Sequence, residues 1–355
     1  MAMGEHAVFR VKSGVSHIHK ECLALARRIL EEGCDCTVRY RLLRDVLRLP
    51  RSSPELHTGR DQLLASPQVA ILTQEQRPNG SWGRLHSMDR RNSVRIGTTE
   101  AGVSYALLLG MTAEDAVLAK AADYLAAVIK GEESVSDRAE RNDRWLAGVQ
   151  LFAASTLARI EPRSPVLDAP WQRWAEIVNR SFASGKFDDV AEEDAHRDVH
   201  GIHDGVGYLS LRNKYAVKLL GTRANELAEP IRNAYVQWLW KQPQGLGYVD
   251  VRLFPPPLSP RGWGISGWLS ELDLLIDYGE PLSQIGDCVD WLWEQRNPSG
   301  LWDFGSRPIT LRFSTNWRRK GQRAQDHSLV PLVLITRCLR AASIRRQQRT
   351  VPRSS

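Results

Sequence analysis

Three histidines and one aspartate form the densest group of residues in this sequence that could do chemistry. They are His196, His200, His203 and Asp204, with the spacing H-x3-H-x2-H-D. Residues four apart face the same side of a helix, so this spacing suits a transition metal or Zn²⁺. A His–Asp pair can also act as general acid and base. Gly201 and Gly205 indicate a loop, which leaves solvated surface as a third interpretation.

Asp326 and His327 form a second pair, directly before an apolar stretch predicted to be a helix. With Ser328 as the N-cap, the helix dipole would lower the pKa of His327 at the mouth of a cavity. Glu100 stands near the start of another apolar stretch, as a cap or as a buried acid. Asn142, Asp143 and Trp145 share that ambiguity. The predicted catalytic residues are His203, Asp204, His327, Asp326, Glu100 and His200.

Two arginine-rich segments, 84–95 and 312–323, suggest an anion site, and the first also contains His86. Guanidinium groups bind diphosphate through bidentate contacts, and solvated surface is the alternative. Aromatic rings can line a cavity and stabilise a cation, and core packing is the alternative for each ring. The predicted ligand-binding residues are Arg84, Arg95, Arg312, Arg318, Tyr105, Trp145, Trp263 and Trp268, with Tyr208 as a further wall candidate.

The elements that must position these residues are helices, because apolar residues recur at helical spacing and strand patterns are nearly absent. The predicted helices span 16–32, 37–48, 62–76, 98–110, 113–130, 144–160, 171–184, 209–221, 225–241, 262–279, 283–295 and 328–342. Gly110, Gly221 and Gly279 follow apolar helices as left-handed caps would. The helices ending at Gly110 and Gly279 should be buried, whereas 113–130 and 225–241 are amphipathic and should lie outside.

A repeat is present in the turns between these helices. Gln76 to Trp82 has the form Q-x3-G-x-W, and Gln295 to Trp302 repeats it with one extra residue. Weaker copies surround Gly185 and Gly245, and with Gly131 the glycines follow one another at steps of 51 to 60 residues. Such a period indicates stacked helix pairs, and these turns are expected to be structural staples.

The repeat predicts an all-α fold, an α/α toroid of about six inner and outer helix pairs. The helix at 16–32 would close the ring on the helix at 328–342. One domain would then cover residues 1–343, followed by a disordered basic tail at 344–355. The connections 83–97, 186–208, 249–261 and 303–327 would share one rim of the central cavity.

These turns resemble the QW repeats of the squalene cyclase and protein prenyltransferase superfamily. The order of segments 38–45, 76–82, 263–275 and 295–302 is most similar to short bacterial squalene-cyclase-like proteins of unestablished function. The resemblance covers residues 37–342. It implies a terpenoid cyclase/prenyltransferase-like toroid with an isoprenoid or diphosphate-bearing ligand in a central aromatic cavity.

Two family sites are not carried over to this chain. Class II cyclases use a D-x-D-D acid, and Asp273 and Asp277 have a different spacing, although one helical face could hold both as an acid pair. Prenyltransferases hold zinc with Asp, Cys and His, but Asp287, Cys288 and His327 are spaced differently, and Cys288 is predicted to be packing.

Composition excludes several other classes of protein. The chain has 355 residues, of which 42% are hydrophobic and 25% charged, as in a globular protein. Its net charge is +7, but no compact basic stripe alternates with aromatics, so nucleic-acid binding is not favoured. No apolar run reaches about 18 residues, and the N-terminus lacks a signal peptide's apolar stretch, which predicts a cytoplasmic protein. Five cysteines are too few for a disulfide framework.

Three functions follow from these observations. The first is a terpenoid cyclase- or prenyltransferase-like enzyme acting on a small apolar or anionic ligand. The second is a non-catalytic toroid that binds a ligand or a protein, and the third is a lyase or hydrolase using the His and Asp residues. The sequence does not require a cofactor. A divalent metal ion bound by the histidines is the one cofactor that we consider. Peripheral membrane contact and the oligomeric state stay open.

Overall fold

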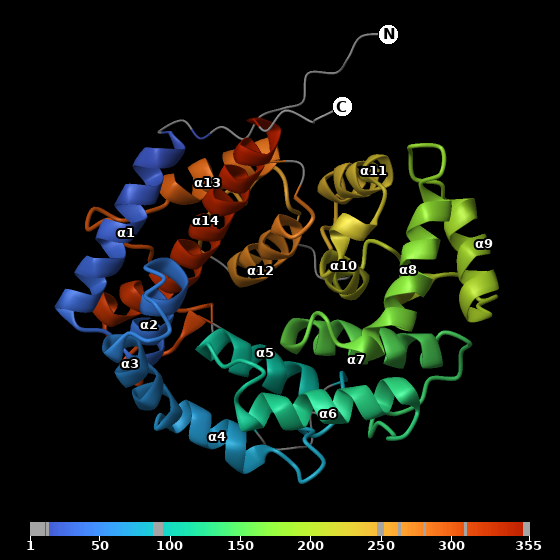
Figure 1. Cartoon of the computed structure of the whole chain (residues 1–355), viewed down its shortest axis with the longest axis horizontal. Helices are drawn as coiled ribbons and strands as arrows, with labels where there is room; N and C mark the ends of the chain where they lie inside the picture. Colours follow the sequence, from blue (N-terminus) through green and yellow to red (C-terminus); the bar gives the residue numbers. More distant parts are fainter. Residues whose placement is uncertain are drawn as a thin grey trace. The chain divides into compact units, whose positions relative to one another are not determined.

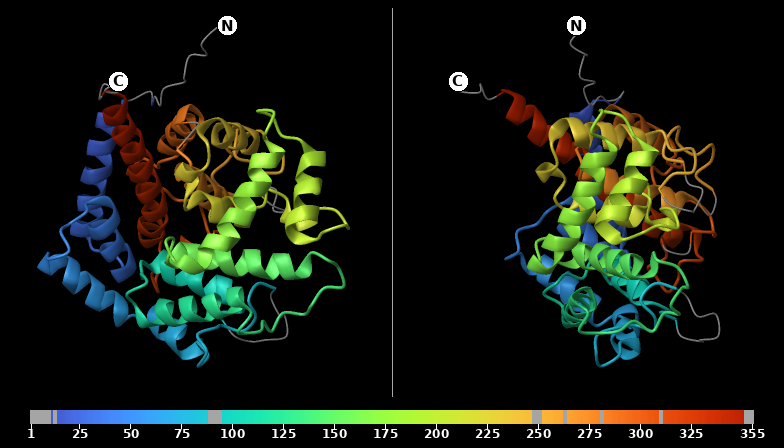
Figure 2. Two further views of the ribbon diagram at one scale, coloured as in Figure 1. Left: turned by 45° about the vertical axis from the view of Figure 1, so that its right-hand side comes forward. Right: turned by 90° about the vertical axis from the view of Figure 1, so that its right-hand side faces the viewer.

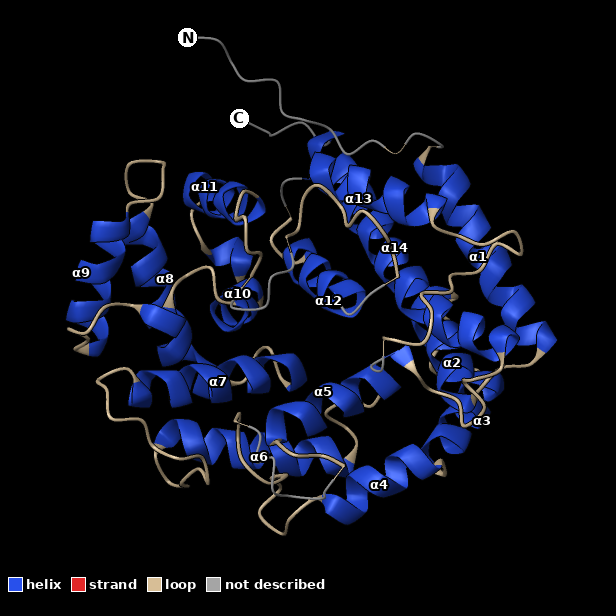
Figure 3. Ribbon diagram, turned by 180° about the vertical axis from the view of Figure 1, so that it is seen from behind, coloured by secondary structure: helices blue, strands red, loops and turns tan. Residues whose placement is uncertain are grey.

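A computed structural model describes residues 11, 14–87, 95–246, 252–261, 264–279, 282–308 and 311–350 of the chain. Every regular element in these residues is helical (Figure 3), which confirms the predicted all-α class. The one sheet-like contact within them is an isolated bridge between Arg84 and Thr98. None of the described helices is both long and apolar enough to cross a membrane.

The chain divides into two compact units. Unit 1 comprises residues 1–61, 240–243 and 250–355, and unit 2 comprises residues 62–239 and 244–249. The single domain predicted over 1–343 stays a prediction.

Unit 1 is built around its last helix. Its helices are α1 (Val15–Glu32), α2 (Cys36–Arg41), most of α3 (Pro54–Leu64), α12 (Gly264–Ile276), α13 (Leu282–Glu294) and α14 (Lys320–Thr350). Helix α14 packs against α1, α2, α12, α13 and the π-helical turn Leu42–Val46. Figures 1 and 2 show α1 lying beside α14. The predicted contact between the first and last helices is therefore confirmed.

Helix α14 begins eight residues earlier than predicted. The prediction started it at Ser328, but it runs from Lys320 to Thr350, and so includes part of the predicted tail. Ser328 is not an N-cap, since its hydroxyl donates to the Ala324 carbonyl at 2.6 Å inside the helix. The added turns are polar in sequence, yet Asp326 and His327 are buried there. Their burial beneath the 302–314 segment is a tertiary effect that local periodicity does not report.

Unit 2 is built around α7 (Trp145–Ile160), which packs against α5, α6, α8 and α10. The other helices are α4 (Pro67–Glu75), α5 (Thr99–Leu109), α6 (Ala116–Lys130), α8 (Asp168–Ser181), α9 (Asp189–His200), α10 (Lys214–Gly221) and α11 (Glu229–Trp240), with short 3₁₀ turns at Pro165–Leu167, Gly207–Leu209 and Ala224–Glu226. Figure 1 shows α6 alongside α7. Gly110 caps α5 in the left-handed conformation as predicted, with a φ of 104°.

Two local predictions in unit 2 are wrong. Gly221 does not cap a helix in the left-handed region, because it is the last residue of α10 and right-handed Thr222 follows it. Residues 189–200 form helix α9 where a loop was predicted. Gly201, which suggests a loop in the sequence, ends the helix as a left-handed cap with a φ of 68°.

The first Q-x3-G-x-W turn acts as a staple, as predicted. The Gln76 side-chain amide donates to the carbonyls of Gly80 and Val117, at 2.9 and 2.8 Å. The buried Trp82 indole donates to the Leu72 carbonyl at 2.9 Å, and the Trp82 backbone N–H donates to the Thr99 hydroxyl at 3.0 Å. The turn therefore ties α4 to the start of α5.

The second turn repeats the two tryptophan bonds in unit 1, whereas its Gln295 amide donates to the Trp291 carbonyl at 3.3 Å. The Trp302 indole donates to the Leu292 carbonyl at 2.7 Å, again ten residues back. Its backbone N–H donates to the Ser328 hydroxyl at 3.0 Å, as that of Trp82 does to Thr99. Each tryptophan thus joins the helix before it to the helix after it.

Candidate active site

The staple at Trp82 places the next residues against the N-terminus of α5. The Thr99 N–H donates to the Arg84 carbonyl at 2.7 Å, and the Glu100 N–H donates to the Leu85 carbonyl at 3.1 Å. These bonds set His86 beside Glu100, the second residue of α5. The local fold therefore brings a histidine and a carboxylate together without a contact from outside unit 2.

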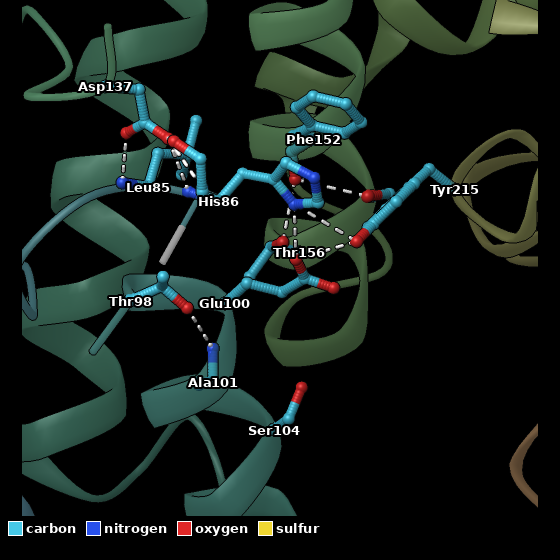
Figure 4. Close-up of polar contacts among 12 residues, drawn as sticks. Leu85, His86, Thr98, Glu100, Ala101, Ser104, Asp137, Phe152, Thr156 and Tyr215 are labelled. Carbon is cyan, nitrogen blue, oxygen red and sulfur yellow. Dashed lines mark hydrogen bonds and ion pairs between the residues drawn. The ribbon is translucent and has the colours of Figure 1, made fainter. Parts of the chain in front are cut away.

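Asp137 fixes the same segment from a distant part of the chain. Its carboxylate accepts the backbone N–H groups of Leu85, His86 and Ser87, at 2.5, 3.1 and 2.7 Å, and the Ser87 hydroxyl at 2.8 Å (Figure 4). Four donors on one carboxylate hold the backbone around His86 in one conformation.

Glu100 joins two further side chains at this place. Its Oε2 lies 2.9 Å from His86 Nδ1 and accepts the Tyr215 hydroxyl at 2.8 Å (Figure 4). Its other oxygen lies 4.0 Å from the Lys218 ammonium. We call His86, Glu100, Tyr215 and Lys218 the His86 cluster. Tyr215 and Lys218 come from α10, so the cluster unites α5, α10 and the 82–87 segment.

The carboxylate at the centre of the His86 cluster is ionised. Burial alone would raise the pKa of Glu100, but the His86 hydrogen bond, the charges of Lys218 and Lys214 and the Tyr215 hydroxyl outweigh it and lower this pKa to about 2. Both lysines also lie 5.1 Å from the centroid of the Tyr215 ring. Two positive charges thus adjoin one half-buried carboxylate.

Aromatic rings form one side of the cluster. The His86 imidazole stacks on Phe152 of α7, with centroids 4.1 Å apart, and meets the edge of Tyr215 at 5.4 Å. Phe152 also lies 6.0 Å from the Tyr208 ring. Gly148 makes room for that tyrosine, because a Cβ at this position would lie 2.8 Å from the ring. The imidazole is therefore held on its flat face by packing and at its edge by hydrogen bonding.

This arrangement can transfer a proton. An ionised carboxylate only accepts, so Nδ1 of His86 must carry the proton of the shared hydrogen bond, and Nε2 of the neutral ring has the lone pair. The His86 side chain is 28% exposed, so the cluster is open to a reactant. A carboxylate behind a histidine orients the ring and stabilises the imidazolium formed on proton uptake.

Of the predicted catalytic residues, Glu100 is the one that lies in the His86 cluster. Its lowered pKa opposes the buried-acid alternative considered for it, and the side chain that caps α5 is that of Thr98. His203 and Asp204 are exposed, and their backbone N–H groups donate to the Asp143 carboxylate at 2.5 and 3.1 Å. The backbone bond from His203 is the main cause that lowers the pKa of Asp143.

His327 and Asp326 serve the packing of unit 1. His327 is 1% exposed, its Nδ1 accepts the Phe304 N–H at 3.0 Å, and its ring stacks on Phe304. Its pKa is lowered to about 4, mainly by burial, and not by a helix N-terminus as predicted, since it lies in the second turn of α14. Asp326 accepts the Phe313 and Ser314 N–H groups, each at 3.0 Å.

His200 belongs to α9 and not to a loop. It packs against Trp174 of α8 and against His196, one turn before it. Among the described residues no group of three or more His, Cys, Asp or Glu side chains is placed to hold a metal ion. The metal ligand set considered for His196, His200 and His203 therefore does not form as a group.

The predicted arginines divide between the units. Arg84 and Arg95 belong to unit 2, where the exposed Arg95 donates its backbone N–H to Glu75 at 3.3 Å. In unit 1 the guanidinium groups of Arg312 and Arg318 lie 3.6 and 5.6 Å from the Trp317 ring. The common rim predicted for these arginines stays a prediction.

The predicted aromatic walls have different outcomes. Trp268 is fully buried, donates to the Leu253 carbonyl at 3.0 Å and packs on Trp291, which corresponds to the core-packing alternative. Tyr105 and Trp145 are half-buried. Trp263 lies outside the described residues. Tyr208, the further candidate, is half-buried beside Phe152.

The two carboxylates considered as an acid pair, Asp273 and Asp277, form ion pairs with an arginine instead. Asp273 and Asp277 both bind the Arg337 guanidinium, which joins α14 to the end of α12. Burial raises the pKa of Asp277 to about 6 although Arg337 opposes this. Cys288 is fully buried, in agreement with the packing role predicted for it.

Sequence reasoning missed Tyr215, Lys218, Asp137 and Phe152. The one signal for them was local, since Lys214 and Lys218 lie one turn apart in an otherwise apolar helix. Comparisons with models of protein families, with curated proteins and with solved structures found no match to this chain.

Proposed function

We propose that this chain is an enzyme in which His86 moves a proton to or from a substrate with an anionic group. The 2.9 Å contact between His86 Nδ1 and the Glu100 carboxylate is the observation that supports this. It leaves Nε2 as the base, and general acid–base catalysis by a positioned histidine contributes about 10²- to 10⁴-fold in rate. The lyase or hydrolase considered from the sequence is the function class that this geometry favours.

The lysines support the anionic part of the proposal. Lys214 and Lys218 place two ammonium groups near one carboxylate, so the local charge is positive by one. A carboxylate, sulfate or phosphate on the substrate would be attracted to this position. Tyr215 would act through Glu100, because its hydroxyl donates to that carboxylate and its side chain is buried.

The α/α toroid is part of the same proposal. It is supported by the two equivalent tryptophan staples, by the alternation of the apolar sequence of α5 with the amphipathic sequence of α6, and by the packing of α1 on α14. We infer about six stacked helix pairs from the period of the turns. The same turns are the basis of the resemblance to the cyclase and prenyltransferase superfamily.

A terpenoid cyclase- or prenyltransferase-like activity is the second candidate. It is favoured by Phe152, whose ring contacts those of Tyr208 and Tyr215, because the Tyr215 ring in turn lies beside the lysines and the group would suit an isoprenoid diphosphate. Cyclisation started by protonating an alkene needs a carboxyl group that keeps its proton. Glu100, with a pKa of about 2, does not meet this need. An isoprenoid diphosphate would instead react here by breaking its C–O bond, with diphosphate as the leaving group and the resulting cation losing a proton to His86.

The test combines ligand capture with variants. Native mass spectrometry on the full chain, incubated with a fractionated metabolite extract, would identify a retained ligand and any mass change in it. His86→Gln should retain the ligand and lose conversion by at least about 100-fold. His203→Ala is the matched control, because that histidine is exposed and outside the His86 cluster.

Lys214→Ala should weaken ligand retention more than it slows conversion, the pattern of a binding group. Conversion by His86→Gln at the unsubstituted rate would overturn the proposed role of His86. Retention of a ligand that the unsubstituted chain never converts would overturn catalysis and support the non-catalytic toroid.

A further inference from the structure

A pocket of about 490 Å³ lies in unit 1, between α1, the turn 298–301 and the start of α14. Pockets that bind small molecules have volumes of about 300–1,000 Å³, so this one has room for an organic ligand. Helix α1 contributes Arg28 and Glu32 to its wall, and α14 contributes Gly321 and Gln325. Most of the residues that line it are polar or glycine, which favours a polar ligand over an apolar one.

The two tryptophan turns differ in what lies beside their glycines. At the first turn the backbone of α6 fills this space, because an added Cβ at Gly80 would clash with the Lys120 carbonyl. At the second turn an added Cβ at Gly300 would first meet the Arg28 guanidinium, at 3.6 Å. The second turn thus keeps its tryptophan staple, but it borders a pocket where the first turn borders a packed helix.

Gln325 is the buried polar side chain of this pocket, with 8% of its surface exposed. Its Oε1 accepts the Gln322 amide at 3.2 Å, but its Nε2 has no hydrogen-bond partner among the described residues. Buried polar groups in folded proteins are nearly always paired. A buried donor without a partner at the wall of a pocket therefore points to a ligand that carries an acceptor.

The other donors at the pocket favour an anion as that acceptor. Arg28 donates Nη2 to the Ser299 carbonyl at 2.5 Å, and its Nη1 has no partner in the part of the chain that the structure describes. The Gly321 N–H, in the first turn of α14, is likewise unpaired within these residues. Unpaired N–H groups and the helix dipole make such an N-terminus attractive to phosphate. One group with several anionic oxygens would satisfy these donors together.

Glu32 limits what the rest of the ligand can be. Its carboxylate lines the pocket and lies 3.7 Å from Nε of Arg28. A carboxylate accepts hydrogen bonds from hydroxyl groups and repels a second anionic group. The lining therefore suits a ligand that has one anionic end and hydroxyl groups at the other.

We propose that this pocket binds a hydroxylated phosphate ester of the sugar phosphate class. The phosphate would lie at the start of α14, where Gln325, the Gly321 N–H and Arg28 donate to its oxygens. Hydrogen bonds from a guanidinium to phosphate are charge-assisted and among the strong ones. The hydroxyl groups would donate to Glu32. All of these residues belong to unit 1, so the site is independent of the activity proposed for His86.

The experiment is isothermal titration calorimetry on the full chain in a phosphate-free buffer, with ribose 5-phosphate, ribose and inorganic phosphate as probes. Ribose 5-phosphate should bind saturably and more tightly than either of the other two. Arg28→Gln should weaken this binding by at least about tenfold, because the charged donor is lost. Arg27→Gln removes the same charge from the neighbouring exposed arginine of α1, and as the matched control it should leave the affinity nearly unchanged.

Two further variants separate the ends of the ligand. Gln325→Glu keeps the acceptor for Gln322 and replaces the unpaired donor by a carboxylate oxygen, so it should abolish binding of both phosphates. Glu32→Gln should weaken the binding of ribose 5-phosphate without weakening that of inorganic phosphate.

Arg28→Gln is the deciding variant, because its side chain is partly exposed and circular dichroism can show that the chain is folded. Unchanged binding of ribose 5-phosphate by this variant, an equal loss in Arg27→Gln, or no saturable binding by the unsubstituted chain would each overturn the proposal. Ribose binding as tightly as ribose 5-phosphate would overturn it as well.

Discussion

Two histidines in this chain show how the surroundings of one ring decide its use. His86 keeps 28% of its side chain exposed and shares its Nδ1 proton with an ionised carboxylate. His327 is sealed in unit 1, where its Nδ1 accepts a backbone N–H instead. The first ring is oriented by a carboxylate and stays partly exposed, whereas burial lowers the pKa of the second. The same side chain is thus a candidate base in one place and a packing residue in the other.

Two replacements of His327 should distinguish the contribution of its hydrogen bond to stability from the contribution of its protonation. Its pKa is about 4 in the folded chain against 6.5 ordinarily, so the unfolded chain takes up the proton first as the pH falls. The stability linked to this group is therefore full above pH 6.5 and is lost as the pH falls toward 4. His327→Asn keeps an acceptor for Phe304 and cannot titrate. In urea unfolding between pH 7 and 4, the free energy of unfolding should fall less steeply with pH in this variant. The difference in slope should correspond to at most about one proton taken up on unfolding.

His327→Ala removes the acceptor as well. It should cost about 1–3 kcal/mol even at pH 7, because the Phe304 N–H is then buried without a partner. An unchanged pH slope in His327→Asn would show that His327 does not titrate as inferred.

The elements repeat one staple at two places. In both turns the indole reaches a carbonyl ten residues back, and the tryptophan N–H reaches a hydroxyl at the start of the next helix or inside it. Glycine closes the first turn because nothing larger fits. Gly80 has a φ of 89°, and a Cβ there would lie 2.1 Å from the Lys120 carbonyl oxygen.

Gly80→Ala should therefore be far more destabilising than an alanine at another left-handed glycine. Gly131, which caps α6, is the matched control, since its φ is 77° but no atom lies within 4 Å of its added Cβ. Gly131→Ala should cost about 1–2 kcal/mol from backbone strain alone. Gly80→Ala should cost clearly more, because the backbone of α6 must also move. Chemical denaturation of both variants checks this, and equal losses would refute the proposed close contact.

Helix positions were largely predictable because each helix has its own apolar period. Helix α9 was missed because its sequence is acidic and polar, and because Gly201 reads equally as a loop or as a cap. In the candidate site, Glu100 was predicted from its place at a helix start. Its partners His86, Tyr215 and Lys218 lie 14, 115 and 118 residues away from it, and no local pattern encodes those contacts.

At the scale of the whole molecule, unit 1 packs the first helix of the chain, α1, against its last helix, α14. It buries one face, formed by Ile18, Cys22, Leu25, Ala26 and Ile29. That face packs on α14, and α1 also carries Arg28, which donates to the Ser299 carbonyl at 2.5 Å beside the second staple. Helix α1 is thus joined to two distant segments of its own unit.

Deletion of residues 1–35 should therefore loosen unit 1 first. The three buried isoleucine and leucine side chains of α1 contribute about 1.5–3 kcal/mol each, so the summed loss is comparable to the stability margin of a typical domain. Hydrogen exchange followed by mass spectrometry should show lost protection in α14, which packs on α1, and in α13, which packs on α14. Helices α5, α6 and α7 of unit 2 should keep their protection. Full protection in α14 would show that α1 adds nothing to unit 1. Equal loss in α7 would show that the two units unfold as one.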